Sequence, residues 1–210
     1  MEFDLSELKG TDCSKLLNST TVPRPIGWLV TMDAEGRTNA APFSYFNVMS
    51  PNPPMVCVGI SSRADDIHKD SAANILATKQ FVVNFVNYEN RHKMNVGGAD
   101  FGPGISELEK AGLTPAPSTK IAPPRIAESP AGYECELAHT VELGNSRYIF
   151  VGRVLVVHIQ DEMMLDAERL YVDTPKLDLI GRMHGGGWYA RTTDLFEMPR
   201  LSKDEVEAAE

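Results

Sequence analysis

A long segment with strand-like alternation is the feature of this sequence that most restricts its fold. In residues 133–143, apolar side chains and His139 occupy every second position, while Glu134, Glu136 and Glu142 stand between them. A period of two is that of a β-strand, in which successive side chains point to opposite faces. We therefore expect a strand here with one face in the core and the other toward solvent.

The segment that follows is apolar on both faces. Residues 147–159 read RYIFVGRVLVVHI, in which charged side chains are few and β-branched residues are common. This pattern predicts a strand that is buried on both sides or that curls through the wall of a barrel. Gly152, within this segment, is suited to a bulge or a sharp bend.

Short strand-like runs also dominate the first half of the chain. Residues 26–31, 55–60 and 80–86 are rich in apolar residues and typical of strands, and residues 33–36 form a polar turn that ends in glycine. About six strands with mostly antiparallel spacing indicate a mainly β fold, a β-barrel with short helices. The regular alternation of strand and helix that a doubly wound α/β fold requires is absent from the sequence.

Helical segments are few. Residues 66–79 predict a first helix, with Asp70 or Ser71 as its N-cap residue. Three further local features are expected: a short helix over residues 106–111 that Gly112 ends, an irregular connection over residues 114–132, and a C-terminal helix over residues 203–210 capped by Ser202.

Length and charge limit the domain organisation and the partners. The chain has 210 residues, 42% of them hydrophobic and 23% charged, which is ordinary for a globular protein. No internal repeat or long linker divides it, so we expect one domain. Its 20 Lys and Arg residues against 29 Asp and Glu residues give a net charge of −9. An acidic chain lacks the basic surface that sequence-independent binding of nucleic acid requires.

Cysteine usage and the N-terminal sequence bear on the compartment. The three cysteines, Cys13, Cys57 and Cys135, form neither a disulfide framework nor a CxxC pair, which fits a reducing environment. The first ten residues are acidic and lack the apolar core of a signal peptide. The longest apolar run, residues 154–157, is far too short to cross a membrane. We expect a cytoplasmic protein without a membrane segment.

Motifs for several common chemistries are absent or fail in context. Residues 185–190 match G-x-G-x-x-A, but too little chain follows to build the βαβ unit of a dinucleotide-binding domain. The chain has no Gly-Lys pair for a P-loop and no HExxH pattern, and its cysteines offer no tetrahedral ligand set. Residues 59–63 fail the nucleophile-elbow pattern. Neither a metal site nor an activated nucleophile is indicated.

One region does suggest a binding site. Ser61, Ser62 and Arg63 come directly after a predicted strand, and Lys69 directly precedes Asp70 and Ser71, the candidate N-cap residues of the predicted helix. Hydroxyl groups, cations and a helix N-terminus together favour a phosphate group. The residues are equally consistent with a simple helix cap flanked by solvated cations. Spacing alone leaves both interpretations open.

Four sequence blocks resemble a known family. RPIGWLVT, NAAPFSYFNVMSPNPPMV, KDSAANI and GRMHGGGWYAR are similar to the flavin reductase-like, FMN-binding split-barrel proteins, which include flavoredoxin-type proteins and the reductase components of two-component flavin monooxygenases. The resemblance implies a six-stranded antiparallel split β-barrel. It also implies an N-terminal extension over residues 1–21, the split-barrel domain over residues 22–191, and a C-terminal extension with an acidic tail over residues 192–210.

The same motifs imply which residues lie near the flavin. The segment 42–47 would contact the edge of the isoalloxazine ring, the residues around Arg63 and Lys69 would hold the ribityl chain and phosphate, and the block at 181–191 would lie close to the ring. Without the resemblance, the aromatic residues Trp28, Tyr45 and Phe46 would be assigned to the core. The residues implied at the cofactor are Arg24, Pro25, Ile26, Trp28, Ser44, Tyr45, Phe46, Asn47, Ser61, Ser62, Arg63, Lys69, Asp70, Ser71, His184 and Tyr189.

For function, the resemblance implies an oxidoreductase that transfers hydride from NADH or NADPH to a flavin, with FMN favoured over FAD. It further implies a homodimer and a monooxygenase or other electron-acceptor protein as partner. The flavin carries such chemistry, so no side chain is needed as an acid or base. One alternative is a flavoredoxin-like electron carrier that holds FMN without turning over NAD(P)H. Another is a barrel that binds a different ligand altogether.

Overall fold

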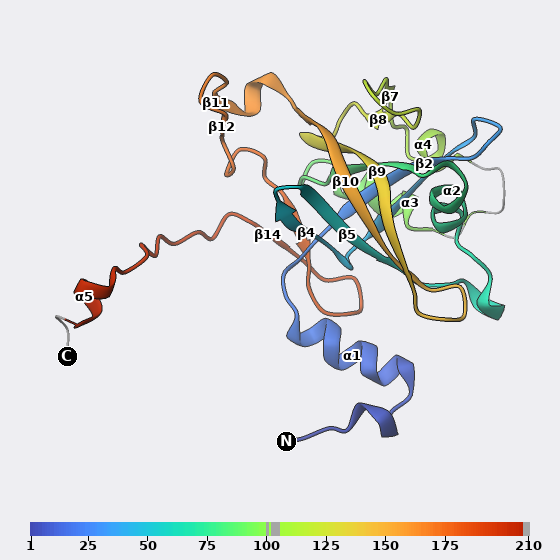
Figure 1. Cartoon of the computed structure of the whole chain (residues 1–210), viewed down its shortest axis with the longest axis horizontal. Helices are drawn as coiled ribbons and strands as arrows, with labels where there is room; N and C mark the ends of the chain where they lie inside the picture. The colour runs from blue at the N-terminus through green and yellow to red at the C-terminus, as the bar shows by residue number, and fades with distance from the viewer. Residues whose placement is uncertain (100, 102–105, 208–210) are drawn as a thin grey trace.

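A seven-stranded antiparallel sheet forms the body of the protein (Figure 1). The computed structural model describes residues 1–99, 101 and 106–207. Strand order in the sheet is β3-β2-β6-β9-β10-β5-β4. These strands are β2 (Gly27–Met32), β3 (Thr38–Phe43), β4 (Phe46–Pro51), β5 (Pro54–Ile60), β6 (Gln80–Phe85), β9 (Ala131–Glu142) and β10 (Tyr148–Ile159).

The mainly β, antiparallel fold class is confirmed, with one more strand in the sheet than the six expected. The strands that the residue pattern did not single out, β3 and β4, are the two edges of the sheet. Each contains proline, and an edge strand tolerates proline because one side of its backbone needs no ladder partner. The residue pattern therefore gives only a weak signal for the edge strands.

Shorter elements surround the sheet. The helix α1 and the C-terminal segment project away from it (Figure 1), and no residue of α1 is buried. The remaining elements are η1 (Leu5–Glu7), α1 (Gly10–Thr20), β1 (Arg24–Pro25), η2 (Ala64–Asp66), α2 (Asp70–Thr78), α3 (Arg91–Gly97), α4 (Glu107–Lys110), β7 (Pro115–Ala116), β8 (Arg125–Ile126), η3 (Asp161–Met163), β11 (Met164–Asp166), β12 (Tyr171–Val172), β13 (Ile180–Arg182), β14 (Tyr189–Arg191) and α5 (Lys203–Glu207).

Both faces of the sheet are covered, which explains why its strands are apolar at successive positions. Leu29 of β2 belongs to one buried cluster together with Ile75 of α2. Trp28, the next residue in β2, belongs to a second cluster together with Met94 of α3 and Leu108 of α4. Successive residues of a strand point to opposite faces, so two cores require a strand without a polar face.

The first helix differs from its prediction at the N-terminus. It begins at Asp70, not at residue 66, and its N-cap residue is Lys69, so neither Asp70 nor Ser71 is the N-cap. The side chains of both residues have other partners: Asp70 pairs with Arg63 at 3.1 Å, and the Ser71 hydroxyl accepts a 2.7 Å hydrogen bond from Asn39.

Two other helix ends have the capping residues that the sequence predicted. Gly112 follows α4 with a φ of +60°, a conformation that favours glycine, and its amide closes the turn onto Glu109. Ser202 and Glu205 bond to each other's backbone N–H groups before α5, as in a capping box. The expected C-terminal helix extends to Glu207, and residues 208–210 lie outside the described residues. The expected connection over residues 114–132 is irregular apart from two two-residue strands and ends two residues early, because β9 begins at Ala131.

The two faces expected for residues 133–143 are only partly correct. On the expected core face, His139, Val141 and Leu143 are exposed, since the buried cluster includes this strand only up to Leu137.

On the expected solvent face, Glu134 is the exception. Glu134 has 0% exposure. Its carboxylate accepts hydrogen bonds from the backbone N–H groups of Thr119 at 2.6 Å and Lys120 at 2.7 Å, and from Nε2 of His158 at 2.6 Å. Alternation predicts the face a side chain occupies, but not that a distant loop covers that face. Glu134 ties this loop to the barrel.

Gly152 is the position where a side chain has least room. The β9–β10 register shifts between Val151 and Gly152, as the expected bulge requires. A Cβ atom at Gly152 would overlap Cζ of Phe81 and lie 2.9 Å from its Cε1 atom. Phe81 is fully buried and has no space to withdraw.

We expect the substitution Gly152→Ala to destabilise the fold by about 1–3 kcal/mol, because overpacking a closed core forces strained side chains. Gly10→Ala is the matched control, since a Cβ atom at Gly10 meets nothing within 4 Å. Thermal unfolding of both variants measures the difference. Equal melting temperatures for the two variants would show that Phe81 relaxes freely.

Candidate functional site

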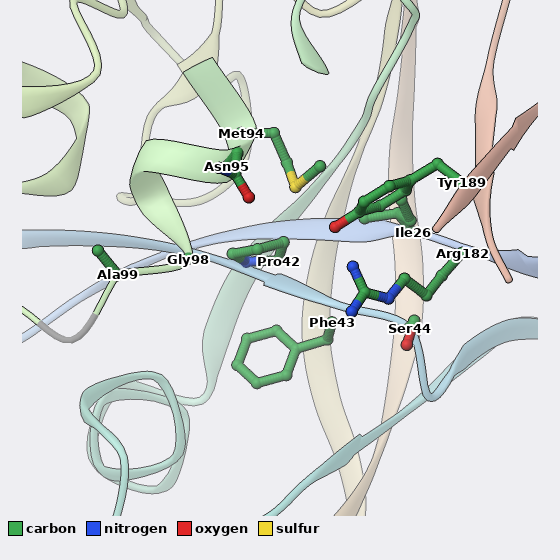
Figure 2. A pocket seen from close by; sticks show the side chains of 10 residues that line it. All are labelled: Ile26, Pro42, Phe43, Ser44, Met94, Asn95, Gly98, Ala99, Arg182 and Tyr189. Carbon is green, nitrogen blue, oxygen red and sulfur yellow. The ribbon is translucent and has the colours of Figure 1, made fainter. Parts of the chain in front are cut away.

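Two adjoining cavities lie along β3. The first has a volume of about 420 Å³ and is lined by Ile26, Pro42, Phe43, Ser44, Met94, Asn95, Gly98, Ala99, Arg182 and Tyr189 (Figure 2). The second has a volume of about 270 Å³ and is lined by Asn39, Ala41, Pro42, Phe43, Arg63, Ala64, Lys69, Asp70, Ser71, Gly97, Gly98, Ala99, Phe101 and Glu107. Because Pro42, Phe43, Gly98 and Ala99 line both, the two cavities form one cleft.

The first cavity combines apolar side chains with polar groups and one cationic side chain. Ile26, Pro42 and Met94 supply apolar surface. Arg182 of β13 faces Tyr189 of β14 in register, and its guanidinium carbon lies 4.6 Å from the centre of the tyrosine ring. Figure 2 shows this guanidinium group extending into the cavity beside the Tyr189 ring. The cavity therefore suits a flat group with polar edges that carries partial negative charge.

The second cavity gathers cations at the start of a helix. Arg63 and Lys69 line it, and α2 begins directly after Lys69, whose side chain does not cap the helix. The Lys69 ammonium also lies 5.8 Å from the centre of the Phe43 ring. A helix start presents N–H groups and the positive end of the helix dipole. Together with two cationic side chains, this end of the cleft is built to attract an anion.

A buried carboxylate also borders the second cavity. Glu107 of α4 is 7% exposed and accepts a 3.1 Å hydrogen bond from the backbone N–H of Ala40. Burial raises the pKa of the Glu107 carboxyl above its ordinary value, with Asp70 as a further contributor. The bond fixes α4 against β3. The sequence held no sign of this role, because Glu107 stands in a short polar segment.

The structure brings many of the expected site residues to the cleft and places others beside it. Ile26, Ser44 and Tyr189 line the first cavity, and Arg63, Lys69, Asp70 and Ser71 line the second. A third, more apolar cavity of about 460 Å³ lies on the other side of Ser44. It is lined by six of the expected residues, namely Arg24, Pro25, Ser44, Tyr45, Phe46 and Asn47.

Four expected residues line none of these three cavities. Trp28 is fully buried, and its indole nitrogen faces Gly97 of α3, so this residue belongs to the core. Ser61 and Ser62 follow β5 without contributing to the lining. His184 is exposed on the glycine-rich loop of the β13–β14 hairpin, where its ring lies 5.8 Å from that of Trp188. Direct contact with a ligand in the cleft is therefore not supported for these four residues.

Arg24 has a structural role that the sequence did not reveal. It is 6% exposed, and its guanidinium group donates hydrogen bonds to the backbone oxygens of Asn18 at 2.7 Å and Thr21 at 2.8 Å. A longer bond of 3.4 Å joins it to the hydroxyl of Ser44. Tyr45 also bonds to the Asn18 side chain, at 3.0 Å. These contacts couple the end of α1 to the segment that borders the cleft.

Several lining residues were missed by sequence reasoning. Pro42 and Phe43 fell within the segment expected at the ring edge but were not named individually as site residues. Gly98 and Ala99 belong to a segment whose glycines predicted only a loop. In the block that contains Arg182, the family resemblance implied His184 and Tyr189 as site residues and not Arg182. The other missed residues are Asn39, Ala41, Ala64, Met94, Asn95, Gly97, Phe101 and Glu107.

Two other kinds of site were searched for in the part of the chain that the structure describes. No group of three or more His, Cys, Asp or Glu side chains there could hold a metal ion. None of its helices has the length and apolar character needed to cross a bilayer.

Comparison with known proteins identifies the family. The family model of the flavin reductase like domain matches residues 19–175. The chain belongs to the flavin reductase-like family. The resemblance seen in its sequence blocks is therefore confirmed, and the barrel is the split barrel of this family.

Solved structures of similar proteins support this placement in the flavin reductase-like family. The chain is 32% identical to a 2-nitrobenzoate 2-nitroreductase from Pseudomonas fluorescens, over 97% of this chain and 98% of that one, with a TM-score of 0.88. It is 30% identical to nitrilotriacetate monooxygenase component B from Bacillus cereus, over 94% and 98%, with a TM-score of 0.87. A flavoredoxin from Desulfovibrio vulgaris shares the fold at 19% identity, over 97% and 100%, with a TM-score of 0.76.

Proposed function

We propose that this flavin reductase-like protein binds FMN in the cleft and reduces it with NADH or NADPH. The observation that carries the proposal is the continuity of the two cavities. A cavity with apolar side chains, polar groups and one arginine opens into a cavity with a helix start, two cations and two carboxylates, one of which is paired with Arg63. FMN has the same sequence of parts, a flat ring system joined through a polar chain to a phosphate.

The residue types in the cleft match the chemical groups of FMN. Arg63, Lys69 and the N–H groups at the start of α2 would hold the phosphate. Ile26, Met94 and Tyr189 would contact the ring. We favour FMN over FAD because the sequence blocks of this chain resemble the FMN-binding split-barrel proteins.

A bound flavin would supply the hydride and electron transfer. The protein's contribution is electrostatic and geometric. Arg182 places a positive charge in a cavity from which a ligand would displace water, and there it would stabilise negative charge on that ligand more strongly than in water. Pairing across β13 and β14 and contact with the Tyr189 ring hold this guanidinium group in place.

Anaerobic mixing of the FMN-loaded protein with NADH, and separately with NADPH, tests the proposal. Rapid bleaching of the visible flavin absorbance by either nucleotide is the expected result. Flavin that stays bound and oxidised with both nucleotides would instead indicate an electron carrier that receives electrons from another protein. We further propose that reduced flavin is passed to a monooxygenase or other acceptor protein, supported by the similarity to nitrilotriacetate monooxygenase component B.

Reduction of an aromatic nitro acid is a second candidate function. It is supported by the similarity to a 2-nitrobenzoate 2-nitroreductase over nearly the whole chain. Arg182 forms no ion pair with any described residue, so its charge remains available for a carboxylate in the first cavity. NADH oxidation that accelerates on adding 2-nitrobenzoate would favour this function, whereas an unchanged rate would exclude that substrate.

We also propose a homodimer, because apolar side chains are exposed at both ends of the chain. Leu17 of α1 is 50% exposed, and in the C-terminal segment Phe196 is 81% and Met198 78% exposed. Such surface is normally covered by another protein surface. Sedimentation equilibrium is expected to give twice the chain mass of 23.1 kDa. A stable single-chain species at micromolar concentration that still binds FMN would exclude the dimer.

A further inference from the structure

Two arginines from distant parts of the sequence meet on one tyrosine ring outside the cleft. Tyr88 lies in the loop that follows β6. The guanidinium carbon of Arg91, the first residue of α3, lies 3.8 Å from the centre of the Tyr88 ring. That of Arg191, the last residue of β14, lies 4.0 Å from the same point. We call these three residues the Tyr88 cluster.

The cluster is held in place by hydrogen bonds. Arg191 donates from Nε and Nη2 to the two carboxylate oxygens of Asp178, at 3.1 Å and 2.7 Å. The backbone N–H of Tyr88 bonds to the carbonyl oxygen of Asp178 at 2.9 Å, and Arg91 donates to the carbonyl oxygen of Tyr88. A guanidinium group fixed in this way loses little conformational entropy when it binds a ligand.

Both arginines are neighbours of residues that line the first cavity. Arg191 stands two positions after Tyr189 in β14, so both side chains leave the strand on the same side. Arg91 stands four positions before Asn95 in α3, so both lie on the same helix face. Figure 2 shows the Tyr189 ring extending toward Met94, the residue before Asn95. The Tyr88 cluster therefore lies at the rim of the first cavity.

The arginines at this rim keep donors that their partners do not occupy. Asp178 accepts from Nε and Nη2 of Arg191, so Nη1 of this guanidinium group is not bonded to that carboxylate. Arg191 remains 44% exposed at its side chain despite these contacts. The acidic residue Glu89, next to Tyr88 in the chain, is also exposed. A guanidinium group stacked on an aromatic ring still donates in its own plane, and phosphate oxygens accept such hydrogen bonds.

We propose that the Tyr88 cluster binds the pyrophosphate of the pyridine nucleotide that delivers hydride in the adjoining cavity. This inference rests on the proposed function for its choice of nucleotide. With the phosphate of FMN bound at the start of α2, the pyrophosphate of a second ligand binds at the rim of the first cavity. The charged, non-bridging oxygens of the pyrophosphate accept hydrogen bonds from Arg91 and Arg191, which positions the nicotinamide end over the cleft.

The single variants Arg91→Met and Arg191→Met test the proposal. Each is expected to raise KM for NADH or NADPH by about tenfold or more, because a charge-assisted hydrogen bond contributes roughly 1.5–3 kcal/mol, or about one to two powers of ten. The value of kcat and the affinity for FMN are expected to stay unchanged, since the lost contact stabilises ground state and transition state equally. Arg169→Met is the matched control, because Arg169 also stacks on a tyrosine, Tyr171, with 4.5 Å between guanidinium carbon and ring centre.

Calorimetric titration with ADP-ribose separates this inference from the proposed function. ADP-ribose contains the pyrophosphate but cannot donate hydride. Binding by the wild-type protein that both variants weaken supports the cluster, even if neither nucleotide reduces the flavin. Active protein in which both variants leave KM and ADP-ribose affinity unchanged would overturn the inference and leave the reductase function standing. Wild-type protein that binds no ADP-ribose would likewise overturn it.

Discussion

The double variant Arg63→Met/Lys69→Met is expected to bind FMN about a thousandfold more weakly than the wild-type protein. Both side chains line the cavity at the start of α2. A hydrogen bond to a charged group contributes roughly 1.5–3 kcal/mol, and about 1.4 kcal/mol corresponds to a factor of ten in affinity. The loss of Arg63 also leaves the Asp70 carboxylate without this ion pair, so it would repel a phosphate.

The control variant for this effect removes two positive charges elsewhere. Lys79 stands at the C-terminal end of α2, and Lys15 is exposed on α1. The variant Lys15→Met/Lys79→Met therefore matches the change in net charge but leaves the second cavity intact. Fluorescence titration of FMN measures both affinities. Equal affinities in the two double variants would show that the phosphate binds elsewhere.

Removal of the buried carboxylate at Glu134 is expected to give the largest loss of stability. Glu134→Ala leaves the N–H groups of Thr119 and Lys120 and the ring of His158 without their acceptor. Breaking a buried hydrogen-bonded pair by removing one partner costs about 3–5 kcal/mol. Glu136→Ala is the matched control, because Glu136 lies two residues further on the same strand and is exposed. Denaturant unfolding that gives equal stabilities for the two variants would contradict this account.

The same carboxylate makes stability depend on pH. Burial alone would raise the pKa of Glu134, but hydrogen bonds from Thr119, His158 and Lys120 hold it below the ordinary value of 4.5. A group with a lowered pKa in the folded state stabilises the fold above its unfolded-state pKa. That stabilisation is lost as pH falls from about 4.5 through the folded-state pKa. The Glu134→Gln variant is expected to lack this part of the acid sensitivity in unfolding curves recorded across that range.

Sequence periodicity predicted the central strands of the sheet, because side chains that are buried in the core leave a recognisable apolar pattern in the sequence. The β9 and β10 segments were recognised from alternation and from continuous apolar character, and Gly152 from its place within a strand. The β3 and β4 edges were not singled out, since backbone pairing defines them more than side-chain pattern does. The burial of Glu134 depends on a loop some fifteen residues away, a contact that no local pattern carries.

The candidate site was predicted best where a short stretch of sequence supplies several of its groups. Lys69, Asp70 and Ser71 line the second cavity together because a helix begins there. Trp28 shows the opposite case: a family motif gives a residue type at a position, but its side chain points into the core. Arg182 and Glu107 reach the cleft from elements more than sixty residues from β3, and their position follows only from the folded chain.

The central claim is that the cleft along β3 binds FMN, and an equilibrium titration of FMN with the purified protein tests it most directly. The visible absorption bands and the fluorescence of FMN report the environment of its ring. The account predicts a saturable change in both signals, at one FMN per chain, that the Arg63→Met/Lys69→Met variant weakens. Absorption and fluorescence that stay those of free FMN at all protein concentrations would contradict it.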